Sequence, residues 1–235
     1  MTRASQVLSI SSLTGRTGQG VRIAVIDSGV HDGHPHVGSI TGAVAFDEHG
    51  QQHGDVVDRL GHGTAVAAAI HEKAPEAALV AIKIFGRSLT TTGAALAAAI
   101  QFAIGARADI INLSLGTSNP EHRQHLEAVV AQATSADVAV VAAAPDAANE
   151  WLPGALPGVI GVELDWTCPR EECVVTRRVD GEVRVRASGF PRPIPGVPPE
   201  RNLKGQSFAV ANATGLIALA YQGVGQRSRA ILFAQ

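Results

Sequence analysis

The chain has 235 residues, of which 46% are hydrophobic and 17% are charged, and its formal net charge at pH 7 is -2. This length and apolar content suffice to bury one substantial core, so we predict a single domain over residues 1–235. The weak charge and an aromatic content of 4% argue against nucleic-acid binding, which needs a basic surface or aromatic platforms for bases. No apolar run reaches the ~20 residues that a membrane-spanning helix needs, so no membrane association is predicted.

The N-terminal segment is mostly polar. Residues 1–20 lack the apolar stretch of a secretory signal peptide, so we predict a cytoplasmic location. Three glycines, Gly15, Gly18 and Gly20, stand near its end. The segment is therefore expected to be a lead-in to the domain, with room for one short helix.

The first strand is predicted at residues 21–26, a β-rich apolar run typical of strands buried in a parallel sheet. The run ends at Asp27, Ser28 and Gly29. Open α/β sheets bind their ligands at the carboxyl ends of strands, which makes Asp27 a candidate site residue. Taken alone, an aspartate that caps a turn is the commoner case.

The next segment is rich in histidine, glycine and aspartate. Histidines stand at five positions: His31, His34, His36, His49 and His53. Their spacing fits no closed set of metal ligands, and the surrounding glycines and aspartates are typical of surface loops. We therefore predict a loop that holds no metal ion.

A second candidate side chain is His62, which stands between Gly61 and Gly63 where an alanine-rich helix begins. Pro75 ends that helix. Strands and helices then alternate, with strands predicted at residues 78–84, 109–116 and 138–143 and helices at residues 92–106 and 120–135. This alternation indicates βαβ units and a parallel sheet covered by helices on both faces, with several strand ends along one edge.

The pattern changes after residue 145. The segments that follow are a short strand at residues 159–162, a hairpin of residues 174–179 and 183–187 that turns at residues 180–181, and a proline-rich loop at residues 191–199. That loop leads to Ser207, which stands among small residues at the start of a predicted buried helix. A serine hydroxyl attacks a carbonyl only when a base lies within hydrogen-bond reach and a further group orients that base.

Two cysteines, Cys168 and Cys173, enclose four residues. Two thiols cannot complete a four-ligand zinc site without help, and a cytosolic pair more often stays reduced. A local disulfide is the alternative, but we predict two thiols in a loop.

Three short strings contain the candidate side chains in the order Asp27, His62, Ser207. They are Val25-Ile26-Asp27-Ser28-Gly29, Gly61-His62-Gly63-Thr64 and Gly205-Gln206-Ser207-Phe208-Ala209. Each string alone also fits a turn or a helix start without a function. Together, their order and the α/β pattern resemble the subtilisin-like serine peptidases. Similar strings at residues 34–35, 74–75, 111–116 and 140–144 extend the resemblance over about residues 20–220.

The resemblance implies a three-layer α/β fold, with a mostly parallel central sheet, helices on both faces and a small C-terminal hairpin. It also implies a serine endopeptidase that needs no cofactor. Ser207 would attack the scissile carbonyl, His62 would take and return its proton, and Asp27 would hold the imidazole in the correct tautomer.

The substrate site implied by the resemblance combines a strand end that pairs with an extended peptide and the walls of a specificity pocket. The residues expected there are Ser114, Leu115, Gly116, Ala142, Ala143 and Ala144. Because these walls are small, the pocket is expected to accept a bulky apolar side chain.

The chain departs from the family pattern at the oxyanion position, where Pro145-Asp146 replaces the usual Gly-Asn. The asparagine amide donates to the oxyanion, and loss of that donor lowers turnover by roughly 10²–10³. An ionised Asp146 can only accept hydrogen bonds. Three alternatives stay open: Asp146 is protonated, Asn149 replaces it, or the Ser207 backbone N–H acts alone. A proprotein convertase branch of the family is similar in having aspartate there.

Other departures concern inserted segments. The helix from His62 to Pro75 lacks the inserted loop that carries calcium in many relatives, so no calcium site is expected there. The chain also lacks the propeptide that helps secreted relatives to fold. It is expected either to fold unaided or to need a partner protein or a missing domain.

We predict a dedicated endopeptidase that matures a precursor peptide or removes a leader, with a peptide or protein as substrate. The alternative is a catalytically weakened or inactive peptide-binding scaffold within a complex. A nucleotide-binding protein is excluded, because no glycine-rich phosphate loop follows residue 26 and the carboxylate of Asp27 would repel a pyrophosphate.

Overall fold

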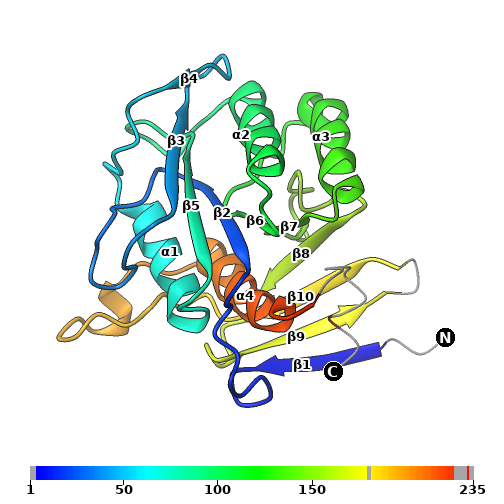
Figure 1. The fold of residues 1–235 in the computed structure, drawn as a ribbon. Coiled ribbons are helices and arrows are strands. Elements are labelled where there is room, and N and C mark those ends of the chain that lie inside the picture. The colour runs from blue at the N-terminus through cyan, green and yellow to red at the C-terminus, as the bar shows by residue number, and fades with distance from the viewer. Residues whose placement is uncertain (1–3, 179–180, 225–231, 233–235) are drawn as a thin grey trace.

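The computed structural model describes residues 4–178, 181–224 and 232. In this part of the chain, one ten-stranded sheet has the order β1-β9-β10-β8-β7-β6-β2-β5-β3-β4 (Figure 1). The strands are β1 (Ala4–Ser9), β2 (Arg22–Asp27), β3 (Gly42–Phe46), β4 (Gln52–His53), β5 (Ala78–Lys83), β6 (Ile110–Leu113), β7 (Ala139–Ala143), β8 (Val159–Leu164), β9 (Glu172–Arg177) and β10 (Val183–Ala187). The neighbours from β10 through β8, β7, β6, β2 and β5 to β3 pair in parallel, and β1, β9 and β4 pair antiparallel at the two ends.

Helices cover both faces of this sheet. They are α1 (His62–Lys73), α2 (Gly93–Gly105), α3 (Arg123–Ser135) and α4 (Gln206–Tyr221), with short 3₁₀ turns η1 (Pro120–His122) and η2 (Pro199–Arg201). In Figure 1, α2 and α3 lie on one side of the sheet and α1 and α4 on the other. A separate apolar cluster fills each interface. The three-layer α/β fold with a mostly parallel sheet is thus confirmed.

The central elements form where the local pattern is strongest. Five consecutive residues of β2 are buried, as expected for a strand covered on both faces. Every residue of α4 from Phe208 to Tyr221 is buried, because the helix lies between the sheet and α1. At the α1–α4 crossing, a Cβ added to Gly215 would lie 3.0 Å from Lys73 Cβ and 3.1 Å from the Ile70 carbonyl oxygen. The small residue therefore sets how closely the two helices approach.

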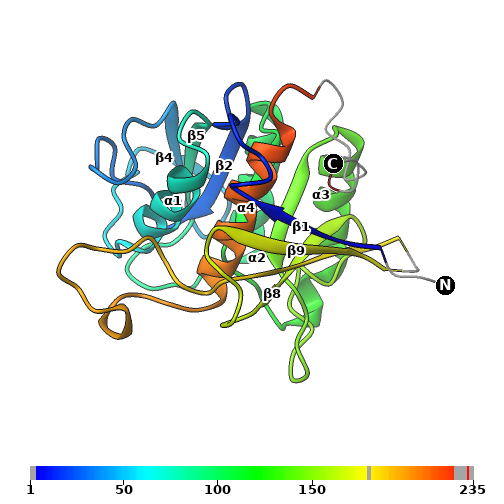
Figure 2. The same cartoon turned by 90° about the horizontal axis from the view of Figure 1, so that it is seen from below.

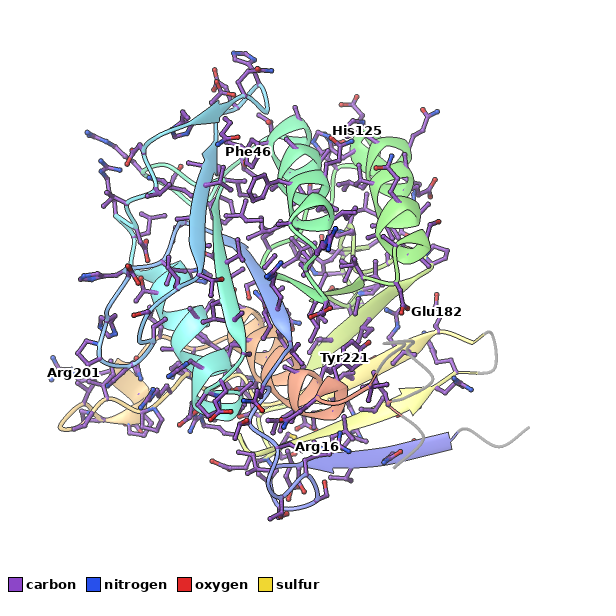
Figure 3. The ribbon with its side chains drawn as sticks, in the orientation of Figure 1. Arg16, Phe46, His125, Glu182, Arg201 and Tyr221 are labelled. Carbon is purple, nitrogen blue, oxygen red and sulfur yellow. The ribbon has the colours of Figure 1, made fainter. Side chains whose placement is uncertain are left out.

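Residues 1–20 were expected to be a lead-in with room for one short helix, but their described part contains strand β1. β1 pairs antiparallel with β9, and Figure 2 shows the two strands side by side. Beyond β1 the chain reaches the end of α4, where Arg16 Nη1 donates to the carbonyls of Leu219 and Ala220 beside Tyr221 (Figure 3). A cation at a helix C-terminus is favourable. This pairing is long-range, so the polar local pattern did not reveal it.

Part of the predicted histidine-rich loop is also strand. β3 lies between β5 and β4, and Phe46 at its end packs against Phe102 of α2 with ring centroids 5.9 Å apart. The run is short and flanked by polar residues, which hid the strand. Among the described residues, no cluster of three or more histidine, cysteine or acidic side chains is arranged to hold a metal ion.

The C-terminal hairpin is confirmed as β9 and β10, which pair antiparallel, although part of its predicted turn at residues 179–180 lies outside the described residues. Both cysteines are free. Placing both thiols in a loop was wrong, because Cys173 lies in β9 with its side chain fully buried. Burial also raises the pKa of the Cys173 thiol above its usual range. In the described ranges, no helix combines the length and apolar character needed to cross a bilayer.

Candidate active site

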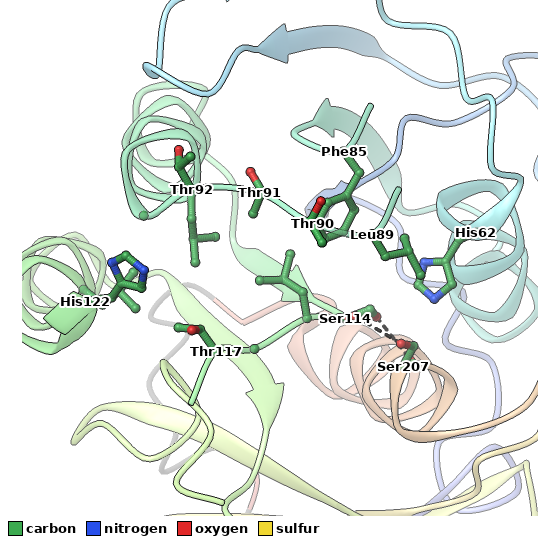
Figure 4. Close-up of a pocket in the computed structure, with 15 residues that line it drawn as sticks. His62, Phe85, Leu89, Thr90, Thr91, Thr92, Ser114, Thr117, His122 and Ser207 are labelled. Carbon is green, nitrogen blue, oxygen red and sulfur yellow. Dashed lines mark hydrogen bonds between the residues drawn. The ribbon is translucent and has the colours of Figure 1, made fainter. Parts of the chain in front are cut away.

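Strand ends and helix starts meet at one edge of the sheet. β2 ends at Asp27, α1 begins at His62, and α4 begins at Gln206, one residue before Ser207. The chain after β6 carries residues 114–117 along the same edge. Figure 4 shows His62 and Ser207 on one cleft, with Ser114 beside Ser207.

Asp27 is fully buried and holds the imidazole of His62. Its Oδ1 lies 2.7 Å from His62 Nδ1 and accepts the Ser28 backbone N–H at 2.7 Å. Since an ionised carboxylate can only accept, Nδ1 carries the proton and Nε2 keeps a free lone pair. Asp27 Oδ2 is buried with no hydrogen-bond partner among the described residues.

The environment of His62 strengthens it as a base. The His62 side chain is 14% exposed. Burial lowers the pKa of His62, but the hydrogen bond and charge of Asp27 and the charge of Asp58 raise the pKa by more than burial lowers it. The pKa of His62 therefore lies above its usual value. The imidazole thus takes a proton more readily than a free histidine does.

Asp58 joins the start of α1 to the end of β2, and sequence reasoning missed it. Its Oδ1 accepts from the Ser28 hydroxyl at 2.8 Å and from the backbone N–H of Leu60 and Gly61. Its Oδ2 accepts from the backbone N–H and the hydroxyl of Thr64, at 3.0 and 2.6 Å. An acidic residue just before a helix start is a recognisable signal of such capping.

Ser28 completes this connection. Its Oγ accepts the Gly63 backbone N–H at 2.9 Å while it donates to Asp58. The first turn of α1 is thereby satisfied by side chains that adjoin Asp27. These bonds position His62 against Asp27 from both elements.

Two hydrogen bonds join Ser207 and Ser114. Ser207 Oγ donates to the Ser114 carbonyl at 3.1 Å, and Ser114 Oγ donates to the Ser207 carbonyl at 2.9 Å. Asn112, whose amide donates to Ser114 Oγ at 3.0 Å, accepts from Thr214 Oγ1 of α4 at 2.9 Å. In this structure the Ser207 hydroxyl therefore donates to Ser114 and has to turn away from it before it can donate to His62.

The carboxylate of Asp146 faces its own loop. Oδ1 accepts the backbone N–H of Ala148 and Asn149, and Oδ2 accepts from Trp151 Nε1 at 2.7 Å. These bonds lower the pKa of the exposed Asp146 carboxyl, with the Trp151 bond as the largest cause. The exposure of Asp146 and its lowered pKa therefore disfavour the alternative of a protonated Asp146 in a dry pocket.

The other two oxyanion candidates differ in position. Asn149 accepts the Asp146 backbone N–H through its carbonyl, and its own backbone N–H donates to the Asp146 carboxylate, so Asn149 lies in the Asp146 loop. The backbone N–H of Ser207 lies in the first turn of α4, where a helix offers no internal acceptor. The Ser207 amide is therefore the better-placed donor for an oxyanion.

Two cavities meet at residues 114–116 and Ser207. One, of about 320 Å³, also reaches His62 and is bounded by residues 89–93, Leu126 and others (Figure 4). The second, of about 640 Å³, extends to Ala143, Ala144 and Asp146. Of the six expected substrate residues, Ala142 alone is not at either cavity, because it is fully buried on the opposite face of β7.

Sequence comparisons place the chain among known peptidases. A model of the subtilase family, Peptidase_S8, matches residues 18–163, more than half of the chain. Subtilisin Savinase of Lederbergia lenta is 37% identical over 140 residues, which cover 55% of this chain and 49% of that protein. Subtilisin of Bacillus pumilus is 34% identical over 139 residues, with the same coverage. The chain spans about half the length of the curated relatives it matches.

Solved structures share the fold. A cold-adapted subtilisin-like serine proteinase superposes with a TM-score of 0.68 at 20% identity, covering 94% of this chain and 82% of that chain. A lanthipeptide protease gives a TM-score of 0.67 at 17% identity, covering 90% and 75%. The prenylagaramide maturation protease PagA gives 0.64 at 24% identity, covering 90% and 79%.

The family match includes Asp27 and His62 but ends before Ser207. The assignment of Ser207 therefore rests on its motif and on its place at the start of α4. The matched region nevertheless contains the central parallel strands from β2 to β7 and the helices between them. The chain belongs to the subtilase family of subtilisin-like serine peptidases.

Proposed function

We propose that the chain is a serine endopeptidase that hydrolyses an extended peptide through an acyl-enzyme. The observation that carries this proposal is the buried Asp27–His62 pair, 2.7 Å apart, on the cleft that also exposes Ser207. A carboxylate held at Nδ1 leaves Nε2 available as the base that serine needs.

In the first step, Ser207 rotates from Ser114 toward His62. Its proton passes to Nε2 as Oγ attacks the substrate carbonyl, and the imidazolium is stabilised by Asp27. When the peptide C–N bond breaks, His62 returns that proton to the leaving amine. Water then hydrolyses the acyl-enzyme by the same two proton transfers.

Substrate binding favours this rotation. A peptide that pairs with the backbone of residues 114–116 offers an N–H to the Ser114 carbonyl, the atom that holds the Ser207 hydroxyl. The peptide N–H adds a second donor to this carbonyl, which weakens the carbonyl's hydrogen bond to the Ser207 hydroxyl. Occupancy of the cleft therefore favours the attacking rotamer of Ser207.

The oxyanion is held by the Ser207 backbone N–H at the positive end of α4. Asp146 supplies no donor, because its ionised carboxylate already accepts from its own loop. Absence of a side-chain donor lowers turnover by roughly 10²–10³ relative to a site with asparagine. A slow enzyme of this kind suits a dedicated role in the maturation of a precursor or the removal of a leader peptide.

Two of the structural neighbours support that role. One is a lanthipeptide protease and another is a maturation protease, and both superpose over 90% of this chain. The predicted cytoplasmic location, and the predicted need for a partner protein or further domain, stay predictions.

A fluorophosphonate probe tests the proposal. We expect the wild-type protein to gain the mass of one phosphonyl group and Ser207→Ala to gain none, with both variants folded by circular dichroism. Ser135→Ala is the matched control, because it removes an exposed hydroxyl at the end of α3, outside the cleft. A folded wild type that does not react would refute the peptidase and favour the peptide-binding scaffold.

A further inference from the structure

The larger cavity at Ser207 has acidic walls. Its 640 Å³ are bounded by small and apolar residues and by two carboxylates, Asp146 and Glu163. No lysine, arginine or histidine is among the described residues that line it. A cavity with only negative charges favours a cation and disfavours an anion.

Glu163 is the carboxylate available to a ligand. It is an exposed residue near the end of β8, beside Val162, whose carbonyl accepts the side-chain amide of Gln206 at 2.6 Å. Gln206 directly precedes Ser207, so Glu163 lies on the wall next to the nucleophile. Among the described residues, the side chain of Glu163 has no hydrogen-bond or ion-pair partner.

Trp151 gives the same cavity an aromatic wall. Its indole N–H donates to Asp146 at 2.7 Å, which holds the ring in place. The residue packs against Gly116, where an added Cβ would lie 3.4 Å from Trp151 Cε3. Tryptophan is the aromatic residue that attracts cations most strongly, and the guanidinium group of arginine stacks on it.

We propose that this cavity binds a basic P1 side chain, arginine or lysine, and that Glu163 is the specificity-determining residue. The inference rests on the proposed function, because P1 is defined by attack of Ser207 on its carbonyl. The alkyl part of the side chain would contact Leu164 and Val210, and the charged end would meet Glu163 beside the indole of Trp151. The small walls alone would favour an apolar side chain, but the two carboxylates and the indole complement a cation.

The test uses peptidyl diphenyl phosphonates that are identical except at P1. These reagents phosphonylate the serine without any need for turnover, and intact mass reports the rate. Arginine is compared with citrulline, which has the same shape without charge, and with phenylalanine and glutamate. We expect arginine to react at least about tenfold faster than citrulline, because the free carboxylate of Glu163 and the indole of Trp151 both attract a cation.

The variant Glu163→Gln removes charge and keeps size. It should lower the arginine-to-citrulline ratio about fivefold, the effect of one partly exposed ion pair. Glu163→Lys should reverse the preference from arginine to glutamate. Glu127→Gln on α3, an equivalent substitution outside the cavity, should leave the ratio unchanged.

The outcomes separate the two proposals. Equal rates for arginine and citrulline, a preference for phenylalanine, or an unchanged ratio in Glu163→Gln would overturn the basic-P1 inference, while reaction at Ser207 would still support the peptidase. Failure of Ser207 to react with every phosphonate and with the fluorophosphonate would overturn the peptidase, and the inference with it.

Discussion

The substitution Asp58→Asn tests whether the start of α1 positions His62. An asparagine keeps one oxygen for the donors that now reach Oδ1 but presents an NH₂ group to Thr64, whose backbone N–H and hydroxyl both donate to Oδ2. The hydroxyl can rotate and accept, whereas the backbone N–H loses its acceptor. One unsatisfied donor costs about 1–3 kcal/mol, and the lost charge at the helix start adds about 0.3–1 kcal/mol.

Because Asp58 is half-buried, we expect the lower part of that range, a fall of about 2 kcal/mol in the free energy of unfolding. Urea denaturation at pH 8 measures it. The acid limb of kcat/KM should also move to lower pH, because the charge of Asp58 raises the pKa of His62 and only neutral His62 acts as a base.

Asp32→Asn is the matched control. Asp32 is exposed and accepts one hydrogen bond, from the Ile40 backbone N–H, which asparagine retains. Its charge does not contribute to the pKa shift of His62. If Asp58→Asn unfolds at the urea concentration of the control and keeps the wild-type acid limb, the positioning role of Asp58 is refuted.

Four further substitutions give distinct results. Asp27→Asn should lower kcat by about 10⁴ in a peptide assay, because the wrong imidazole tautomer is favoured, without loss of thermal stability. Gly215→Ala should lower the free energy of unfolding in urea by about 1–3 kcal/mol, because its Cβ meets Lys73. Gly105→Ala is the control, at an exposed helix position where an added Cβ meets open space. It should raise the free energy of unfolding by up to about 1 kcal/mol. Equal effects at both glycines would contradict the packing argument. Asp146→Asn should change the fluorophosphonate rate by less than about threefold, since the side chain faces its own loop; a gain near the 10²–10³ of a true oxyanion donor would show that it turns into the site.

Sequence reasoning succeeded where a signal is local. The apolar run of β2 and the glycines around His62 specify a buried strand and a helix start without reference to the rest of the chain. Parallel strands then bring their carboxyl ends to one edge, but the prediction that Asp27, His62 and Ser207 share one site came from the resemblance of their three strings to the subtilisin-like peptidases.

Sequence reasoning failed where a strand pairs with a distant part of the chain or where a loop conformation sets the position of a side chain. β1 depends on β9, more than 160 residues away, so its polar pattern indicated no strand. The orientation of Asp146 depends on the turn that brings Trp151 back to it, and the place of Glu163 depends on how β8 meets the start of α4. Loop conformations of this kind leave no periodic pattern in the sequence from which they could be predicted.

The end of β2 buries a charged side chain that the proposed reaction needs. Asp27 is a fully buried carboxylate with one oxygen unpaired among the described residues, an arrangement that a fold selected for stability alone would avoid. The surrounding hydrogen bonds give Oδ2 no partner. They hold Oδ1 against His62 and join Ser28 to Asp58. Removing the charge at Asp27 is therefore expected to spare the free energy of unfolding and to abolish the base, because the same buried charge is costly to bury and is needed to orient His62.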